Sequence, residues 1–234
     1  MANIATVLPT LVLLPSPLLG PSVWRPVAGV LADRGWPTTI CAVPVPVLSG
    51  ADVLECFLSA VPADRDVVLV PHSNAGAYVP ELAVRRSVVA TVFVDAVLPP
   101  PSGRVPLAPP EFLRALREKA DDDGVLPPWT SWWDEADSAD LFPDVGSRAE
   151  VEQEQQQIPL AYLEEALVVP KGWDDVPGAY VAFGDAYAAE RDAAARRGWP
   201  VHTLAAGHLH QLHHPDHVAD ALLGLLDRVL PGAG

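Results

Sequence analysis

The sequence is short of positive charge and of cysteine, and each shortage excludes a class of protein. Its only lysines are Lys119 and Lys171, and the formal net charge is −15. Such a charge argues against a nucleic-acid partner and against binding to an anionic membrane surface. The two cysteines, Cys41 and Cys56, have neither metal-site spacing nor a disulfide-rich setting, so we expect both to be small buried hydrophobes.

Long apolar runs are also missing. The apolar stretch 11–14 is too short and too closely flanked by proline for a membrane helix, and the first residues lack the basic segment of a signal peptide. We therefore expect a cytoplasmic protein without a membrane segment. What the chain does have is apolar content. Of its 234 residues 50% are hydrophobic, which makes disorder improbable and suffices for one sizeable α/β core.

Apolar runs alternate with amphipathic segments in the first hundred residues and again near the end of the chain. This alternation predicts an α/β fold with a mostly parallel sheet of about six strands flanked by helices. Pro80 should kink its helix or distort the opening turn. The expected strands are Ile4–Val7, Thr10–Leu14, Thr38–Val43, Val67–Val70, Val88–Asp95, Ala179–Phe183 and Val201–Leu204, and the expected helices are Arg25–Gly35, Ala51–Ala60, Asn74–Arg85, Ala188–Arg197 and Val218–Val229.

Residues 98–175 differ from the rest of the chain. Prolines and acidic runs recur here, helical patches occur at Pro110–Ala120 and Arg148–Gln156, and no convincing strand is visible. An acidic disordered excursion is one interpretation, but disordered segments are poor in large apolar side chains. We therefore expect residues 98–175 to form a helical cap over a core made of residues 1–97 and 176–234. Four of the seven tryptophans lie in this segment: Trp129, Trp132, Trp133 and Trp173.

The stretch Val67–Gly76, VVLVPHSNAG, combines a short buried strand with a serine at its end. This is the layout of a nucleophile elbow, in which a G-x-S-x-G pattern lifts the serine out of the sheet on a strained turn. The chain places Pro71 and Ala75 where the pattern has glycines. The alternative is that Ser73 merely caps the following helix.

A serine nucleophile needs a general base, which in this order of elements should follow the last strand. His208 does so, directly after Gly207. The neighbouring histidines raise a metal site as an alternative, but Pro215 interrupts the helix that their spacing would require, so we expect no metal. His208 is the favoured base and His210 the second choice. The histidines of this stretch are His208, His210, His213, His214 and His217.

Four stretches together resemble the α/β-hydrolase superfamily over essentially the whole chain: VLVPHSNAG, FVDAVLPP, YVAFGDAY and AAGHLHQL. Within it, the sequence looks most like the small capped esterase and hydroxynitrile-lyase-like branch. The resemblance implies a serine, histidine and acid triad and no cofactor.

The acid of such a triad has two candidates. The usual site follows the penultimate strand, where the chain offers Asp185, although the resemblance places the acid near Ala186 or Tyr187, which carry no carboxylate. A minority of the superfamily places it after the strand that follows the elbow, where Asp95 stands. Either could instead be structural, as a turn residue or a strand-end anchor. The sequence favours Asp185 over Asp95, with Glu190 a distant third.

The oxyanion hole should use the backbone N–H of Asn74 and a second N–H from the loop after the early strand. That loop reads Pro15-Ser16-Pro17, and proline has no N–H. A donor at Pro17 would be absent, whereas Leu18 or Ser16 could supply one if the loop is shifted. Loss of one donor costs roughly 2.7–4 kcal/mol of transition-state stabilisation, which points to slow, specialised or non-hydrolytic chemistry.

These features favour a serine-dependent hydrolase that cleaves an ester, thioester or lactone of an apolar small molecule, with the cap tryptophans Trp129, Trp132 and Trp133 lining an aromatic pocket. One alternative is a lyase, cyclase or isomerase of small-molecule biosynthesis that uses Ser73 and His208 as an acid–base pair. Another is a non-catalytic ligand-binding protein. The sequence predicts no particular oligomeric state.

Overall fold

The central sheet of this computed structural model has six strands in the order β10-β9-β4-β3-β1-β2, and all neighbouring pairs are parallel. The structure describes residues 8–230, without the side chains of residues 136 and 137. The predicted α/β fold and parallel sheet are confirmed, while the expected strand Ile4–Val7 lies outside the described residues. The strands are β1 (Thr10–Leu14), β2 (Thr38–Ile40), β3 (Val67–Ser73), β4 (Val88–Ala96), β9 (Gly178–Phe183) and β10 (Val201–Leu204).

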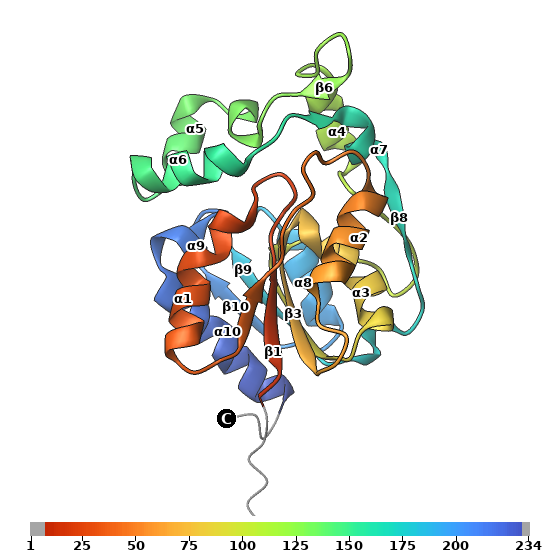
Figure 1. The fold of residues 1–234 in the computed structure, drawn as a ribbon, viewed down its shortest axis with the longest axis vertical. Coiled ribbons are helices and arrows are strands. Elements are labelled where there is room, and N and C mark those ends of the chain that lie inside the picture. Colours follow the sequence, from red (N-terminus) through yellow and green to blue (C-terminus); the bar gives the residue numbers. More distant parts are fainter. Residues whose placement is uncertain (1–7, 231–234) are drawn as a thin grey trace, which may run out of the picture.

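Helices cover both faces of the sheet. Helices α1 and α10 lie on one face, and α2, α3 and α8 lie on the other (Figure 1). In the described part of the chain, no helix is both long enough and apolar enough to cross a membrane. The helices of the core are α1 (Arg25–Asp33), α2 (Gly50–Ala60), α3 (Val79–Arg85), α8 (Ala188–Arg196), α9 (His210–His213) and α10 (Pro215–Val229), with short 3-10 helices η1 (Pro21–Trp24) and η2 (Asn74–Tyr78).

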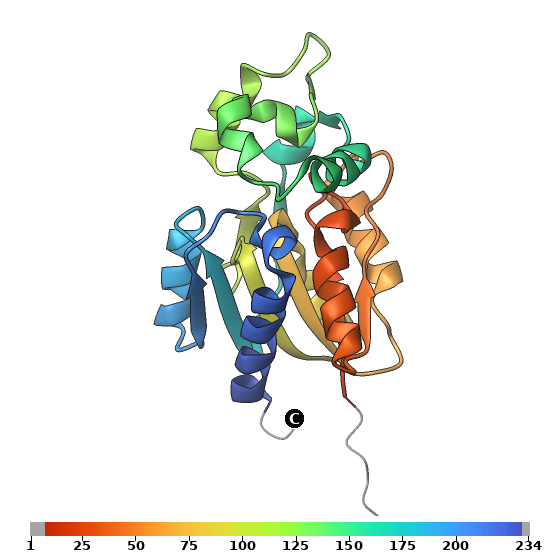
Figure 2. The ribbon, with the colours of Figure 1, turned by 90° about the vertical axis from the view of Figure 1, so that its left-hand side faces the viewer.

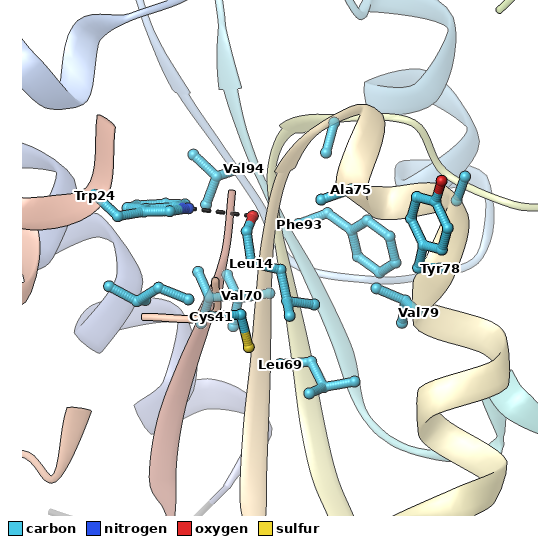
Figure 3. Packing of buried hydrophobic residues seen from close by; sticks show 14 of the residues in the cluster. Leu14, Trp24, Cys41, Leu69, Val70, Ala75, Tyr78, Val79, Phe93 and Val94 are labelled. Carbon is cyan, nitrogen blue, oxygen red and sulfur yellow. Dashed lines mark hydrogen bonds between the residues drawn. The ribbon is translucent and has the colours of Figure 1, made fainter. Parts of the chain in front are cut away.

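The core is packed on both sides of β3 and β4, whose apolar residues are almost all buried. Figure 3 shows Trp24 on one side of these strands and Tyr78 and Val79 on the other. The Trp24 indole N–H donates a hydrogen bond of 3.2 Å to the Leu14 carbonyl, which satisfies the one polar group of a fully buried side chain. Burial on both faces explains why these strands are continuous apolar runs rather than alternating ones.

The chain between β4 and β9 forms a separate layer. Its helices α4 to α7 lie above the end of the sheet at which β1 and β3 finish, whereas β8 runs down beside α2 and α3 (Figures 1 and 2). The segment contains β5 (Gly103–Pro106), α4 (Pro110–Arg117), β6 (Val125–Leu126), η3 (Trp129–Trp132), α5 (Glu135–Ala139), α6 (Val145–Glu154), β7 (Ile158–Pro159), α7 (Leu160–Glu164), β8 (Ala166–Val169) and η4 (Trp173–Asp175).

The expectation that this segment contains helices but no strand is wrong. Strand β5 pairs with β8, and β6 pairs with β7, each in an antiparallel ribbon of two strands. These strands have only two to four residues each, and β5 and β7 end in proline, so they carry little periodicity. Their partners, far apart in sequence, identify them only in three dimensions. The division into a cap of residues 98–175 and a core stays a prediction.

Polar contacts fasten this layer to the core. The Glu154 carboxylate accepts a hydrogen bond of 2.6 Å from the Ser22 N–H and forms an ion pair with Arg25. The Gln156 side chain accepts from the Val47 N–H at 3.1 Å and donates to the Pro44 carbonyl at 2.9 Å. These bonds hold α6 and the residues after it over the loops that follow β1 and β2.

Candidate active site

Ser73 ends β3 with backbone angles φ 58° and ψ −130°, a left-handed φ that few non-glycine residues adopt. The serine is buried, and its carbonyl accepts a hydrogen bond of 3.0 Å from the N–H of Val97. Its side chain makes no capping hydrogen bond to the 3-10 turn η2 that follows, which rules out the helix-cap interpretation. Pro80 stands in the first turn of α3 directly after η2, so the predicted distortion of the opening turn is confirmed.

His208 and Asp95 are brought together across the end of the sheet. The Nδ1 atom of His208 lies 2.6 Å from Oδ2 of Asp95, and the aspartate is completely buried. The other carboxylate oxygen, Oδ1, accepts a hydrogen bond of 2.9 Å from the N–H of Phe183 in the adjacent strand β9. An imidazole that donates its Nδ1 proton to this carboxylate keeps Nε2 free to accept a proton.

Asp185, which the sequence favours as the partner of His208, is not at the imidazole. Its side chain is 90% exposed and forms an ion pair of 3.1 Å with Arg191 in α8. The preceding Gly184 has a φ of 65°, and its N–H donates to the Leu204 carbonyl. The turn after β9 therefore carries Asp185 into solvent, and the structure pairs His208 with the second choice, Asp95. Glu190 is half-buried, and this burial raises the pKa of its carboxyl group.

His72, which sequence analysis missed, lies under the imidazole of His208. The two rings stack with their centroids 4.6 Å apart, and the Nε2 atom of His72 is 3.0 Å from the carbonyl oxygen of His208. A neutral His72 that carries its proton on Nε2 donates this bond and fixes the loop that presents His208. Complete burial lowers the pKa of His72 well below its usual value, and the proximity of His208 lowers it further.

The buried His72 makes stability sensitive to acid. Because the folded-state pKa is below the unfolded value of about 6.5, the unfolded chain takes up a proton that the folded chain does not. Stability contributed by neutral His72 is present above pH 6.5 and falls as the pH drops below it, by up to about 1.4 kcal/mol per pH unit. Urea unfolding at pH 7 and pH 5 measures this loss, which should be smaller in His72→Gln. An equal loss in both proteins would contradict the assignment.

The remaining histidines of the loop are packed against one another rather than against Asp95. The ring centroids of His210 and His214 are 5.1 Å apart, and those of His214 and His217 are 5.0 Å apart. Burial, followed by these neighbours, lowers the pKa of His210, the second choice as base, whose ring lies against Phe183. Among the side chains that the structure describes, no group of three or more His, Cys, Asp or Glu residues is arranged to hold a metal.

Tyr187 is the second site residue that sequence analysis missed. Its hydroxyl lies 3.2 Å from the Oγ atom of Ser73, and its ring stacks on His208 with a centroid distance of 5.6 Å. Within the described residues, no hydrogen bond joins Ser73 to His208, so Tyr187 is the partner of the serine in this structure. Contacts of catalytic pairs are often long in unliganded enzymes. The sequence did contain one indication of its role, because Tyr187 stands at the position where the resemblance implies the triad acid.

Asn74 joins the elbow to the overlying layer. Its side chain donates a hydrogen bond of 2.6 Å to the Leu107 carbonyl and accepts one of 3.0 Å from the Tyr162 hydroxyl. The Tyr162 hydroxyl is also 2.9 Å from that of Tyr78, and burial raises the pKa of both tyrosines. This chain of neutral, buried groups fixes the residue whose backbone N–H was predicted to face the oxyanion.

Of the three tryptophans predicted to line the pocket, the structure brings Trp129 to the imidazole, at 6.3 Å between the ring centroids of Trp129 and His208. Trp132 is buried and packs on Phe112, and its indole N–H donates to the Pro127 carbonyl at 2.7 Å. Trp133 is 39% exposed; it stacks on Phe112 and meets Trp129 edge to face.

The loop after β1 has few free backbone donors. The N–H of Leu18 donates to the Ser16 hydroxyl at 3.2 Å, and the N–H groups of Leu19 and Gly20 both donate to the Ser16 carbonyl at 3.0 Å. Pro15 and Pro17 have no N–H. Of the two residues predicted to supply the second oxyanion donor, Leu18 thus already uses its N–H in a hydrogen bond. The N–H of the buried Ser16 is the remaining candidate.

No family model and no curated protein sequence matches this chain. Solved structures do. An extracellular α/β-hydrolase from a Paenibacillus species, described as sharing structural and functional homology with tobacco salicylic-acid-binding protein 2, has 15% identity and a TM-score of 0.72, over 94% of this chain and 98% of that one. Polyneuridine aldehyde esterase has 16% identity and a TM-score of 0.69, over 94% and 100% of the two chains.

Tomato methylketone synthase I, in complex with 2-tridecanone, has 14% identity and a TM-score of 0.71, over 95% of this chain and 99% of that one. At such identities the likeness concerns the fold, which extends over nearly the whole of each chain. This protein has the α/β-hydrolase fold, in the form that it takes in these structures.

Proposed function

We propose that this protein is a serine-dependent hydrolase that cleaves an ester, thioester or lactone of an apolar small molecule. The observation that carries the proposal is the hydrogen bond of 2.6 Å between His208 and the buried Asp95, beside a serine held in the left-handed elbow conformation. Geometry of this kind serves nucleophilic catalysis, because the carboxylate orients the imidazole that activates the hydroxyl.

In the proposed reaction Ser73 attacks the carbonyl carbon while its proton passes to Nε2 of His208. The Asp95 carboxylate stabilises the resulting imidazolium, and the backbone N–H of Asn74 donates to the oxygen that becomes negatively charged. His208 then protonates the leaving group, which departs. In the second half of the reaction, His208 removes a proton from water while the water oxygen attacks the acyl carbon. The bond between that carbon and Oγ then breaks, the carboxylic acid is released, and the proton passes from His208 to Oγ of Ser73.

The surroundings of His208 favour an apolar substrate. The rings of Trp129 and Tyr187 lie within 6.3 Å and 5.6 Å of the imidazole, centroid to centroid, and further aromatic side chains of the overlying layer pack behind Trp129. Ligand sites lined in this way bury most of a small apolar molecule. Similar structures support this choice, since one is named an esterase and another was solved with the ketone 2-tridecanone. The cap of residues 98–175 would close this site, and a cytoplasmic location remains our expectation.

A second candidate, non-hydrolytic acid–base chemistry on the same scaffold, is favoured by one observation. The N–H groups of Leu18, Leu19 and Gly20 are all bonded to Ser16, which leaves the loop poor in donors for an acyl-transfer oxyanion. A lyase, cyclase or isomerase that uses Ser73 and His208 without an acyl-enzyme would need fewer such donors. The two candidates differ in whether Ser73 becomes acylated.

Labelling with a fluorophosphonate tests the proposal. We expect stoichiometric modification of the native protein, detected as a mass increase and mapped by peptide analysis to Ser73, with none in protein unfolded beforehand. Short incubation with p-nitrophenyl butyrate should also trap an acyl group on the same peptide. A native protein that resists the phosphonate would contradict the hydrolase, and phosphonate labelling without acyl trapping would favour the non-hydrolytic candidate.

A further inference from the structure

The hydroxyl of Tyr187 is a polar group in contact with Ser73 that has no part in the proposed triad. It stands 3.2 Å from the Oγ atom of Ser73. We infer that Tyr187 is a further catalytic residue, which donates a hydrogen bond to the negatively charged oxygen of the tetrahedral intermediate formed on Ser73. This inference rests on the proposed hydrolase function and adds a donor to its oxyanion hole.

Tyr187 is held in place as a donor. Its ring stacks on the imidazole of His208 at an interplanar angle of 27°, and its carbonyl accepts a hydrogen bond of 2.9 Å from the N–H of Arg191 at the start of α8. Burial raises the pKa of the Tyr187 hydroxyl well above its usual value, and the carboxylates of Asp95 and Glu190 raise it further. The phenol therefore keeps its proton throughout the reaction.

The backbone of this site creates the need for such a donor. Apart from Asn74, the expected donors belong to the loop that follows β1. Leu14, the last residue of β1, pairs with Pro71, two residues before Ser73, so this loop starts beside the elbow. From residue 15 to residue 20 that loop contains two prolines and three N–H groups bonded within the loop itself. A tyrosine hydroxyl is among the side-chain groups that proteins use in oxyanion holes.

The position of the hydroxyl fits the proposed step. When Ser73 attacks, the Oγ–H bond breaks and the proton goes to His208, the Oγ–carbon bond forms, and the π electron pair of the carbonyl moves onto its oxygen. That oxygen is then bonded to the same carbon as Oγ, so a hydroxyl already in contact with Oγ is within reach of it. Tyr187 gives a hydrogen bond and transfers no proton, so its O–H bond stays intact in every step.

Tyr187→Phe removes the hydroxyl and keeps the ring that stacks on His208. With p-nitrophenyl butyrate as substrate, we expect kcat to fall about 10²-fold, in line with the loss of one oxyanion donor, while KM changes less than about threefold. An aryl trifluoromethyl ketone, which adds to serine as a hemiketal oxyanion, should lose affinity by a similar factor. Binding of the matching methyl ketone, which does not add to serine to the same extent, should not change.

Further variants and substrates separate this role from others. Tyr187→Leu, which also removes the ring, should reduce phosphonate labelling of Ser73 more than Tyr187→Phe does, since the imidazole loses its support. Unchanged kcat and unchanged trifluoromethyl ketone affinity in Tyr187→Phe would overturn the inference, as would an equal loss of affinity for both ketones, which indicates packing alone.

An effect confined to alkyl esters with poor leaving groups would place the hydrogen bond on the leaving group and would also overturn the inference.

A different result would contradict the proposed hydrolase function itself. If wild type and Ser73→Ala hydrolyse the ester at the same rate and neither binds the trifluoromethyl ketone, no serine chemistry takes place, and the donor role of Tyr187 falls with it. Circular dichroism and the thermal midpoint of each variant confirm that it is folded.

Discussion

Asp95→Asn is expected to lower kcat about 10³–10⁴-fold, whereas Asp185→Asn should leave kcat within about threefold of wild type. Asp95 is completely buried, and its Oδ2 atom is 2.6 Å from Nδ1 of His208. An asparagine that turns its NH2 group toward Nδ1 favours the opposite tautomer, in which Nε2 carries the proton and cannot accept one from Ser73. Asp185 lies in solvent, paired with Arg191, and has no contact with the imidazole.

The two substitutions form a matched pair, because each replaces one carboxylate by its isosteric amide. The rate of Ser73 phosphonylation and the hydrolysis of p-nitrophenyl butyrate measure the effect. Asparagine can retain the bond from the Phe183 N–H to Oδ1, so Asp95→Asn is expected to fold, which a thermal melt checks. A larger loss in Asp185→Asn than in Asp95→Asn would reverse the assignment and return the acid to the site that the sequence favours.

Gly76→Ala is expected to lower the free energy of unfolding by at least about 3 kcal/mol. A Cβ atom at this position would lie 1.9 Å from the carbonyl oxygen of Val97, far inside van der Waals contact. This oxygen belongs to the backbone two residues after Asp95, so Val97 cannot move away without disturbing the aspartate. Ala75, which replaces the glycine of the elbow pattern, is buried with its side chain in the core (Figure 3).

Gly224→Ala provides the control for this prediction. Gly224 lies inside α10, and a Cβ atom there meets nothing within 4 Å. Alanine has a higher helix propensity than glycine, so this variant should be more stable than wild type by about 0.5–1 kcal/mol. Urea unfolding monitored by tryptophan fluorescence compares the two. If Gly76→Ala unfolds within about 1 kcal/mol of wild type, the close approach of the elbow to Val97 is not a requirement of the fold.

The sequence by itself determined the fold class and the end of the sheet at which the candidate active site lies. Apolar runs buried on both faces, such as those of β3 and β4, are identified by local composition, and the serine at the end of β3 is a local feature as well. The same local rules found His208 after the last strand. They did not find β5 and β8, because these strands are defined by pairing across some sixty residues of intervening chain.

Only the tertiary structure decided which side chains meet. Asp95 lies near the end of β4 and Asp185 just after β9, in the same sheet, and the sequence offers no measure of which one the returning loop of His208 reaches. The left-handed turn at Gly184 sends Asp185 outward and leaves Tyr187 against Ser73, while the imidazole of His208, stacked on His72, is bonded to Asp95. Periodicity and composition describe neighbours along the chain, whereas an active site is made of neighbours in space, whose contacts depend on turn geometry and burial.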